Sequence, residues 1–232
     1  MQFNFPRLTP TVRTLLIVLT VVFVVQSVAE GLFHVPVSSW AALTPGVHLG
    51  LLWQWATYWV IELPGGVLQR AFDVLFIYFM LSPLEERYGR RRILELMAIG
   101  IVGGALPVML AGAALPAAFG GLAGASAIGA AGFGAFAVLS GGAMVSFFML
   151  PPMSAWAVLG IFLGVSALNA LWAHDASGLL STLGGTGAGV LYARWLLRPR
   201  SAKSPTPKKK PSGRPNLTVI EGGADDKPRW LN

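Results

Sequence analysis

A single serine stands near the start of a long apolar stretch built mainly from glycine and alanine. The stretch is Gly120–Ser140, and Ser126 is its one hydroxyl before the last residue. Small residues four positions apart, such as Ala125 and Gly129, let neighbouring helices approach closely in a membrane, which is typical of a tightly packed helix. The Ser126 hydroxyl could also act as a nucleophile if a general base lay within hydrogen-bond reach. The rest of the chain has to decide between these interpretations.

The composition indicates a membrane protein. The chain has 232 residues, of which 54% are hydrophobic and 12% charged, and its mean hydropathy of +0.64 is too apolar for an ordinary soluble domain. Residues 97–173 carry no charge, and because one span needs about 20 apolar residues, this run must hold several. The chain has no cysteine, and its three histidines, His34, His48 and His174, are scattered. We therefore expect no metal and no other cofactor.

Six apolar segments predict an all-α membrane domain over residues 14–197, after a polar N-terminal segment at 1–13. Residues 34–66 are rich in tryptophan and interrupted by prolines, which favours a position at the membrane surface. Residues 198–232 are rich in proline, lysine and serine, which predicts a disordered basic tail. The six predicted spans are 14–33, 67–82, 93–115, 122–139, 155–172 and 178–197.

The distribution of basic residues predicts the topology. Six spans place both termini on one side, and the positive-inside rule puts the termini and the Arg87–Arg92 turn in the cytoplasm. In a bacterium, the chain would then lie in the inner membrane with residues 34–66 facing the periplasm. We attribute the net charge of +7 to basic residues that flank the membrane spans and lie beside the lipid bilayer. We therefore expect no nucleic-acid partner.

This topology brings several polar side chains to a similar depth. The second, fourth and sixth predicted spans all start at the outer side. Ser126 and Thr182 each lie about four residues into their spans, roughly 6 Å deep. Gln69 and Asp73 lie in the first two turns of the second span. We therefore expect these four side chains to converge on one cavity that is open to the periplasm.

Five motifs, in order along the chain, resemble those of the rhomboid family of intramembrane serine proteases. The resemblance covers about residues 10–197 and implies a six-helix rhomboid-like bundle with Ser126 at the nucleophile position. It also implies that transmembrane segments of other proteins are the partners, which would approach near the second and fifth spans. The motifs are WQWATYWVIE at 53–62, LEERYGRRR at 84–92, GASAIG at 124–129, FFMLPPMSAW at 147–156 and TLGGTGAG at 182–189.

The residues that would carry the chemistry depart from the family pattern. The resemblance puts Thr182 at the position of the catalytic histidine, and threonine has no useful basicity near neutral pH. Gln69 and Asp73 take positions that help to hold the oxyanion, where glutamine can donate a hydrogen bond but an ionised aspartate repels negative charge. Glu62 replaces a further histidine, and Ala127 replaces the glycine after the serine. These departures favour a pseudoprotease that binds transmembrane client helices.

Two other functions stay open from the sequence. An active intramembrane serine endopeptidase would use Ser126 with an unorthodox base. His174, beside Asp175 in the turn before the sixth span, is a candidate, although a helix would place it about 12 Å from Thr182. A small transporter or channel component would need polar groups through the whole membrane depth, and the uncharged run at 97–173 counts against it.

Overall fold

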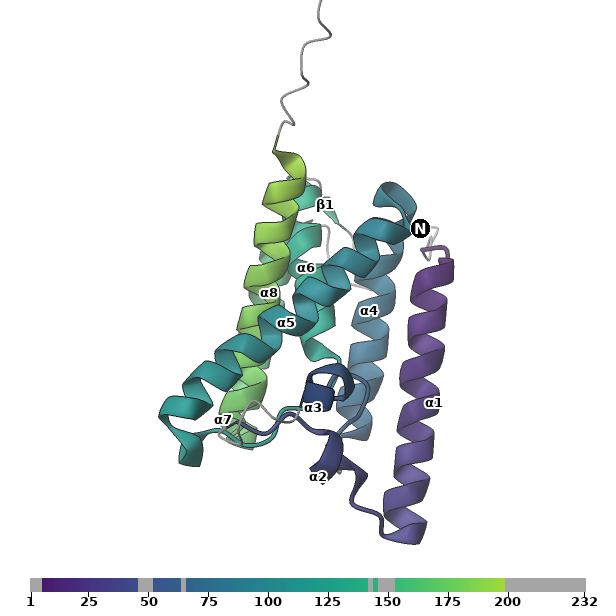
Figure 1. Cartoon of the computed structure of the whole chain (residues 1–232). Helices are drawn as coiled ribbons and strands as arrows, with labels where there is room; N and C mark the ends of the chain where they lie inside the picture. Colours follow the sequence, from purple (N-terminus) through teal and green to yellow (C-terminus); the bar gives the residue numbers. More distant parts are fainter. Residues whose placement is uncertain (1–5, 46–51, 64–65, 142–143, 146–152, 199–232) are drawn as a thin grey trace, which may run out of the picture. The chain divides into compact units, whose positions relative to one another are not determined.

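The computed structural model describes residues 6–45, 52–63, 66–141, 144–145 and 153–198. Three predicted features lie wholly or mostly outside these residues, namely the tail at 198–232, the motif at 147–156 and His48. The described residues form helices and one short pair of strands (Figure 1). The elements are α1 (Pro10–Phe33), α2 (Val37–Ala41), α3 (Leu52–Thr57), α4 (Val67–Tyr88), α5 (Arg90–Ala114), the 3-10 helix η1 (Pro116–Ala118), α6 (Ser126–Leu139), β1 (Met144–Val145), β2 (Met153–Ser154), α7 (Ala155–Ala173) and α8 (Ala176–Leu197).

Four of the described helices are long and apolar enough to cross a membrane. They are α1, α4, α5 and α7, with 24, 22, 25 and 19 residues. The helix α8 has 22 residues, but its serines, threonines and glycines keep it out of this set. The helix α6 has only 14 residues, about 21 Å at 1.5 Å per residue. The predicted all-α, polytopic membrane fold is therefore confirmed, while the six crossings stay a prediction.

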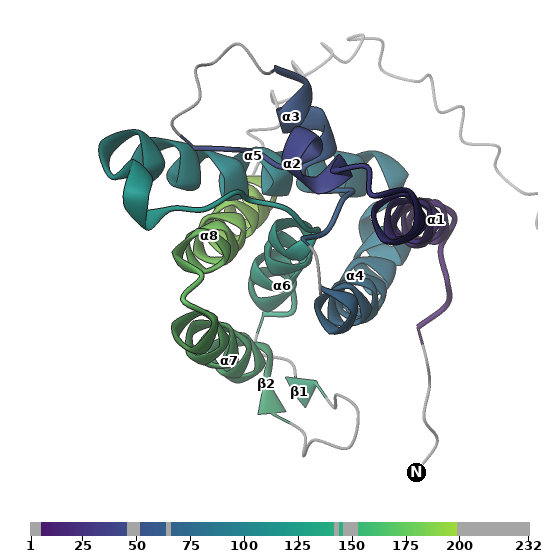
Figure 2. The same cartoon turned by 90° about the horizontal axis from the view of Figure 1, so that it is seen from below.

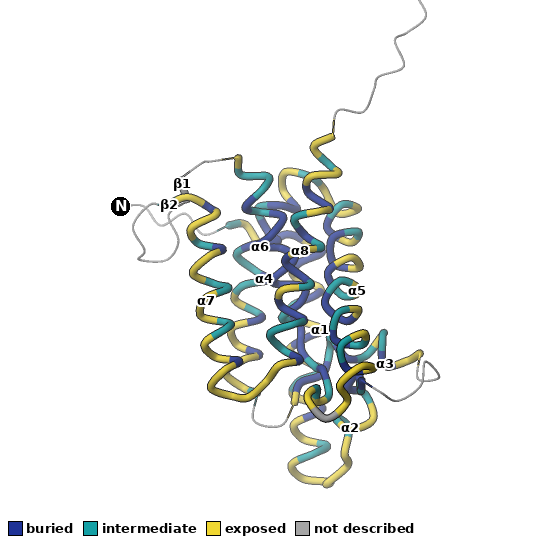
Figure 3. Tube along the Cα trace, turned by 90° about the vertical axis from the view of Figure 1, so that its left-hand side faces the viewer, coloured by how far each residue is buried: buried dark blue, intermediate teal, exposed yellow. Residues whose placement is uncertain are grey.

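The short helix α6 lies at the centre of the bundle. It contacts α4, α5, α7 and α8, and Figure 2 shows it enclosed by these helices. Most of its residues are buried, in contrast to the largely exposed α7 (Figure 3). Because protein rather than lipid covers α6, its surface can consist of glycine and alanine, which explains the composition of this stretch.

Small residues bring the backbones of α6 and α8 into contact. A Cβ atom at Gly185 would lie 2.5 Å from the carbonyl oxygen of Ala127, and one at Gly189 would lie 2.1 Å from that of Ala131. On α5, a Cβ atom at Gly104 would lie 2.4 Å from the Cβ atom of Ala127. The close-packing interpretation of the glycine-rich stretch is therefore correct for the part of α6 that faces α8 and α5.

The sequence predicts the start of the fourth span wrongly. The predicted helix covers 122–139, but α6 begins at Ser126. Leu122 instead pairs with Leu43, and the N–H of each donates to the carbonyl of the other at 2.8 and 2.9 Å. Gly124 has a φ of +109°, which a right-handed helix cannot contain. Ser126 is thus the first residue of its helix and does not lie four residues inside it.

Glu85 of α4 caps the beginning of α1. Its carboxylate accepts hydrogen bonds from the hydroxyl of Thr9 and from the N–H groups of Thr11 and Val12, the latter two at 3.1 Å. The first turn of a helix leaves its N–H groups unpaired and favours negative charge. Within the LEERYGRRR motif, Glu85 therefore has a structural role, since it holds α1 against α4.

We predict that Gly189→Ala destabilises the protein, because the added Cβ atom would meet the backbone of Ala131. Overpacking of this kind costs about 1–3 kcal/mol. The matched control is Gly187→Ala on the same helix, where nothing lies within 4 Å of the Cβ position. Equilibrium unfolding in mixed detergent micelles measures both variants, and equal stabilities would contradict the close approach of α6 and α8.

Candidate functional site

A cavity of about 520 Å³ lies between α4, α6, α7 and α8. The four residues selected from the sequence all line it: Gln69 and Asp73 on α4, Ser126 on α6 and Thr182 on α8. Ser126 begins its helix, and the other three lie in the first two turns of theirs. The structure therefore brings all four side chains to one site, at the end of the bundle where α4, α6 and α8 start.

The helix α7 adds two polar residues that the sequence analysis missed. Ser166 and Asn169 both line the cavity. They lie three positions apart and so share one face of α7, which was the available signal in the sequence. The cavity also has an aromatic wall, formed by Phe76, Phe133 and Phe162, whose ring centroids lie 4.5 to 5.4 Å apart. The lining thus changes from polar near the helix starts to apolar further along the bundle.

The mouth of the cavity lies between α4 and α7. Four apolar residues of these helices line the cavity and are also exposed on the outside of the bundle, namely Leu68, Phe72, Ile161 and Val165. Both helices are long and apolar enough to span a membrane. The exposed side chains at this mouth are therefore of the apolar kind that suits the hydrocarbon layer of a membrane.

The surroundings of Ser126 lack the base that a serine–histidine pair requires. None of the described residues that line the cavity is a histidine. The hydroxyl of Thr182 donates a hydrogen bond of 2.9 Å to the carbonyl oxygen of Gly178 in its own helix. His174 is exposed at the C-terminal end of α7 and is not among the residues lining the cavity. Its neighbour Asp175 caps α8 by accepting from the Gly178 N–H at 2.8 Å.

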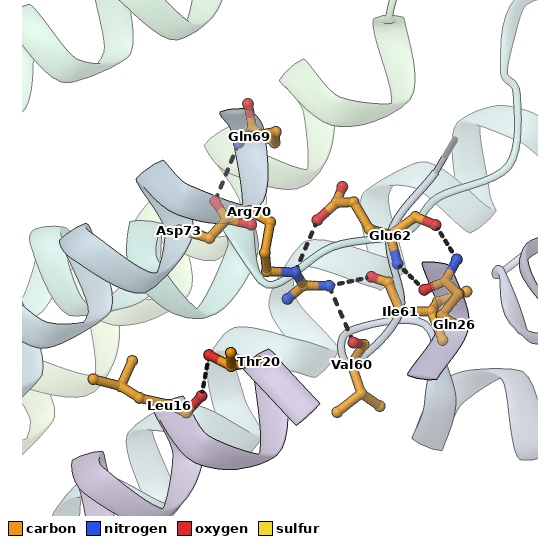
Figure 4. Close-up of polar contacts among 9 residues, drawn as sticks. All are labelled: Leu16, Thr20, Gln26, Val60, Ile61, Glu62, Gln69, Arg70 and Asp73. Atoms are coloured by element: carbon orange, nitrogen blue, oxygen red, sulfur yellow. Dashed lines mark hydrogen bonds and ion pairs between the residues drawn. The ribbon is translucent and has the colours of Figure 1, made fainter. Parts of the chain in front are cut away.

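A cluster of charged side chains is buried next to the cavity, which one of its members, Asp73, lines. Figure 4 shows the contacts of this cluster. Arg70 and Asp73 are each 3% exposed and Glu62 is 5% exposed, so all three charges are taken out of water. The guanidinium of Arg70 donates to the carbonyl oxygens of Val60 and Ile61 at 3.0 and 2.7 Å. Its Nε lies 3.3 Å from Oε2 of Glu62. Arg70 therefore ties the segment before α4 to the first turns of α4.

Asp73 is the member of this cluster that lines the cavity. Its Oδ1 accepts a hydrogen bond of 3.1 Å from Nε2 of Gln69. The guanidinium of Arg70 attracts the carboxylate, and the backbone N–H of Ala125 is directed towards it as a hydrogen-bond donor. Its Oδ2 is buried and has no partner in hydrogen-bond geometry within the described part of the chain. This unpaired carboxylate oxygen is buried beside Gly124.

The carboxylates of Glu62 and Asp73 both lie beside the turn that leads into Ser126. A Cβ atom at Gly124 would lie 3.2 Å from Oε1 of Glu62 and 3.7 Å from Oδ2 of Asp73. A serine protease needs hydrogen-bond donors near its nucleophile to stabilise the oxyanion. Two carboxylates at this place supply acceptors and negative charge instead, which opposes that chemistry.

Glu62 is also fixed through its backbone. Gln26 of α1 donates to the carbonyl oxygen of Glu62 at 2.6 Å and accepts from its N–H at 2.9 Å. Burial raises the pKa of the Glu62 side chain to about 7, because desolvation outweighs the attraction of Arg70 and the charge of Asp73 adds to the rise. The Glu62 carboxyl group therefore holds a proton part of the time near neutral pH.

A comparison with models of protein families identifies the family of the chain. The model of the Rhomboid domain matches residues 50–199, which is more than half of the chain. The chain belongs to the rhomboid family. The match includes all four residues selected from the sequence. The family and the long apolar helices together indicate that this rhomboid protein is an integral membrane protein. A search of curated proteins found no match.

We predict that Glu62→Gln flattens the pH dependence of the stability of this rhomboid protein. Because the pKa of Glu62 is raised from 4.5 to about 7, its protonated form stabilises the fold. That contribution is complete below about pH 4.5 and is lost as the pH rises through about 7. The wild type should lose up to about 3 kcal/mol of unfolding free energy in this range, at about 1.4 kcal/mol per pKa unit.

The free energy of unfolding is measured in mixed micelles across the same pH range. It should fall less for Glu62→Gln than for the wild type. Glu86→Gln is the matched control, because Glu86 lies on α4 but is exposed. This control should keep the wild-type profile. A Glu62→Gln profile as steep as that of the wild type would contradict the assignment of the titration to Glu62.

Proposed function

We propose that this rhomboid-family protein is a pseudoprotease that binds the transmembrane helices of client proteins without hydrolysing them. The observation that carries the proposal is the composition of the cavity around Ser126. Thr182 stands where the resemblance expects the histidine base, and its hydroxyl is bonded within its own helix. Asp73 and Glu62 bring negative charge to the site, whereas hydrolysis needs a base and oxyanion donors there.

A client helix would enter between α4 and α7. The exposed apolar side chains at the mouth match the apolar surface of a transmembrane helix. Only 11% of the apolar window of α7 is buried, against 39% for α4, so α7 is the less firmly held of the two. Inside the cavity, hydroxyl and amide groups can each add an interhelical hydrogen bond of about 1 kcal/mol. These features support binding of a helix from the side, within the membrane.

The proposal includes six membrane crossings, by α1, α4, α5, α6, α7 and α8. Enclosure by the other helices allows α6 to be short, since it has little contact with lipid. The positive-inside rule then places the Arg87–Arg92 turn and both termini in the cytoplasm of a bacterium, with the protein in the inner membrane. The starts of α4, α6 and α8, and with them the polar part of the cavity, would face the periplasm.

An active serine endopeptidase is the second candidate function, and one observation favours it. Asp73 lines the same cavity as Ser126 and has an oxygen without a hydrogen-bond partner among the described residues. A carboxylate can accept the proton of a serine, although less effectively than a base whose pKa lies near neutrality. A transporter is disfavoured, because the aromatic wall of Phe76, Phe133 and Phe162 makes the inner part of the cavity apolar.

Cleavage of a panel of fluorescent transmembrane substrates by purified protein in liposomes tests the proposal. We expect no cleavage by the wild type. The double variant Thr182→His with Asp73→Asn should gain activity, because it restores a base and removes a carboxylate from the site. Adding Ser126→Ala to the double variant should abolish that activity.

Cleavage by the wild type that is lost in Ser126→Ala would overturn the pseudoprotease proposal. Two further variants would then identify the base. Loss of activity in Asp73→Asn would assign the role to Asp73, and loss in His174→Ala would assign it to His174.

A further inference from the structure

We infer that the cavity selects client helices that carry a lysine or arginine side chain in the outer half of their span, with Asp73 as the counter-charge. This inference rests on the proposed function and names the class of its partner. Three features of the site carry it: the charge balance of the buried cluster, the place of Asp73 in the cavity wall, and the depth at which Asp73 lies.

The buried cluster has more negative than positive groups. It contains two carboxylates, Glu62 and Asp73, and one guanidinium, Arg70, and all three are at least nine-tenths buried. The ion pair of Arg70 is with Glu62, and its Nη2 is engaged by two backbone carbonyl oxygens. A buried charge without a partner is costly. In the protein alone, a proton on Glu62 neutralises part of the excess negative charge. A cationic group that reached Asp73 would neutralise the rest.

Asp73 contributes a carboxylate to the wall of the cavity. Asp73 is one of the residues lining it, and Gln69 occupies only its Oδ1. The other polar residues of the lining are neutral and carry oxygen atoms that accept hydrogen bonds, namely Ser126, Ser166, Asn169 and Thr182. An ammonium or guanidinium group has donors and no acceptors. Its donors would therefore find one carboxylate and several neutral acceptors in the same cavity.

The depth of Asp73 sets the position of the basic residue in the client. Asp73 lies six residues after Val67, the first residue of α4, which is about 9 Å along a helix. A lysine or arginine at that depth is costly for a single helix in lipid. Contact with Asp73 would relieve this cost for the client and would supply the missing positive charge to the cluster. The carboxylate of Asp73 and the basic side chain of the client are each poorly compensated when the two proteins are apart. In the complex, each compensates the other.

Binding of synthetic single-span peptides to the full-length protein in liposomes tests the inference. The peptides have the same leucine–alanine span and differ only in lysine or leucine at the sixth position from the outer end. Because the chain has no cysteine, Leu32→Cys provides a single site for an acceptor dye. Leu32 is 73% exposed on α1 and is not a lining residue of the cavity. Energy transfer from a dye on the peptide then reports binding.

We expect the lysine peptide to bind the wild type about tenfold more tightly than the leucine peptide, the effect of one charge-assisted hydrogen bond. Asp73→Asn should remove this preference, so that the lysine and leucine peptides bind this variant equally. Thermal unfolding in the same liposomes checks that the variant is folded. Asp73→Glu should keep a preference for lysine. Asp175→Asn is the matched control, because it removes an exposed acid while asparagine still caps α8, and it should behave as the wild type.

Equal binding of both peptides to the wild type would overturn the inference and leave client binding in place. A lysine preference that survived in Asp73→Asn would also overturn it. If neither peptide bound, the proposed function would fail together with the inference. The leucine peptide therefore distinguishes failure of the charge selection from failure of client binding.

Discussion

The buried guanidinium of Arg70 is the group that holds the loop before α4 in place. A charge removed from water must be compensated by hydrogen bonds and opposite charge. Arg70 obtains both from the segment before its own helix, through the carbonyl oxygens of Val60 and Ile61 and the carboxylate of Glu62. These contacts hold Glu62 beside Gly124, and so next to the turn that starts α6. One ion therefore holds the loop and the carboxylate of Glu62 beside the turn that leads to Ser126.

The scaffold of this protein is separate from the groups that would perform hydrolysis. Backbone contacts at Gly185 and Gly189 hold α8 against α6, and they require small residues but no particular chemistry. Thr182 lies one turn before Gly185, and within the described part of the chain its hydroxyl donates to the carbonyl oxygen of Gly178 in its own helix. The identity of residue 182 can therefore change without disturbing the contact between the two helices. Under the proposed function, this separation would allow the rhomboid fold to be kept while the residue at position 182 differs from the family's base.

Much of this architecture could be predicted from the sequence, because apolar runs in a membrane protein indicate helices directly. The convergence of Ser126 and Thr182 followed from counting spans, since alternate spans start at the same side. The late start of α6 could not be predicted. It depends on the pairing of Leu43 with Leu122, two residues far apart in the chain. A helix pattern contains no information about such a contact.

The polar environment of the cavity was predicted only in part. Gln69 and Asp73 were recognisable because charged and amide groups are rare at the start of a span. Asn169 of α7 was missed, because a neutral side chain in a long apolar run is a weak signal. The pairing of Arg70 with Glu62 was also missed, since it requires the loop to fold back onto α4.

Reaction of Ser126 with a serine-directed phosphonate probe, detected by mass spectrometry of the intact protein, tests the central claim most directly. The probe reacts with a serine that a neighbouring base activates, and the measurement needs no knowledge of the client. We predict no adduct on the wild type in liposomes and an adduct at Ser126 in the variant Thr182→His with Asp73→Asn. An adduct at Ser126 of the wild type would contradict the account, because it would show that the cavity still contains an effective base.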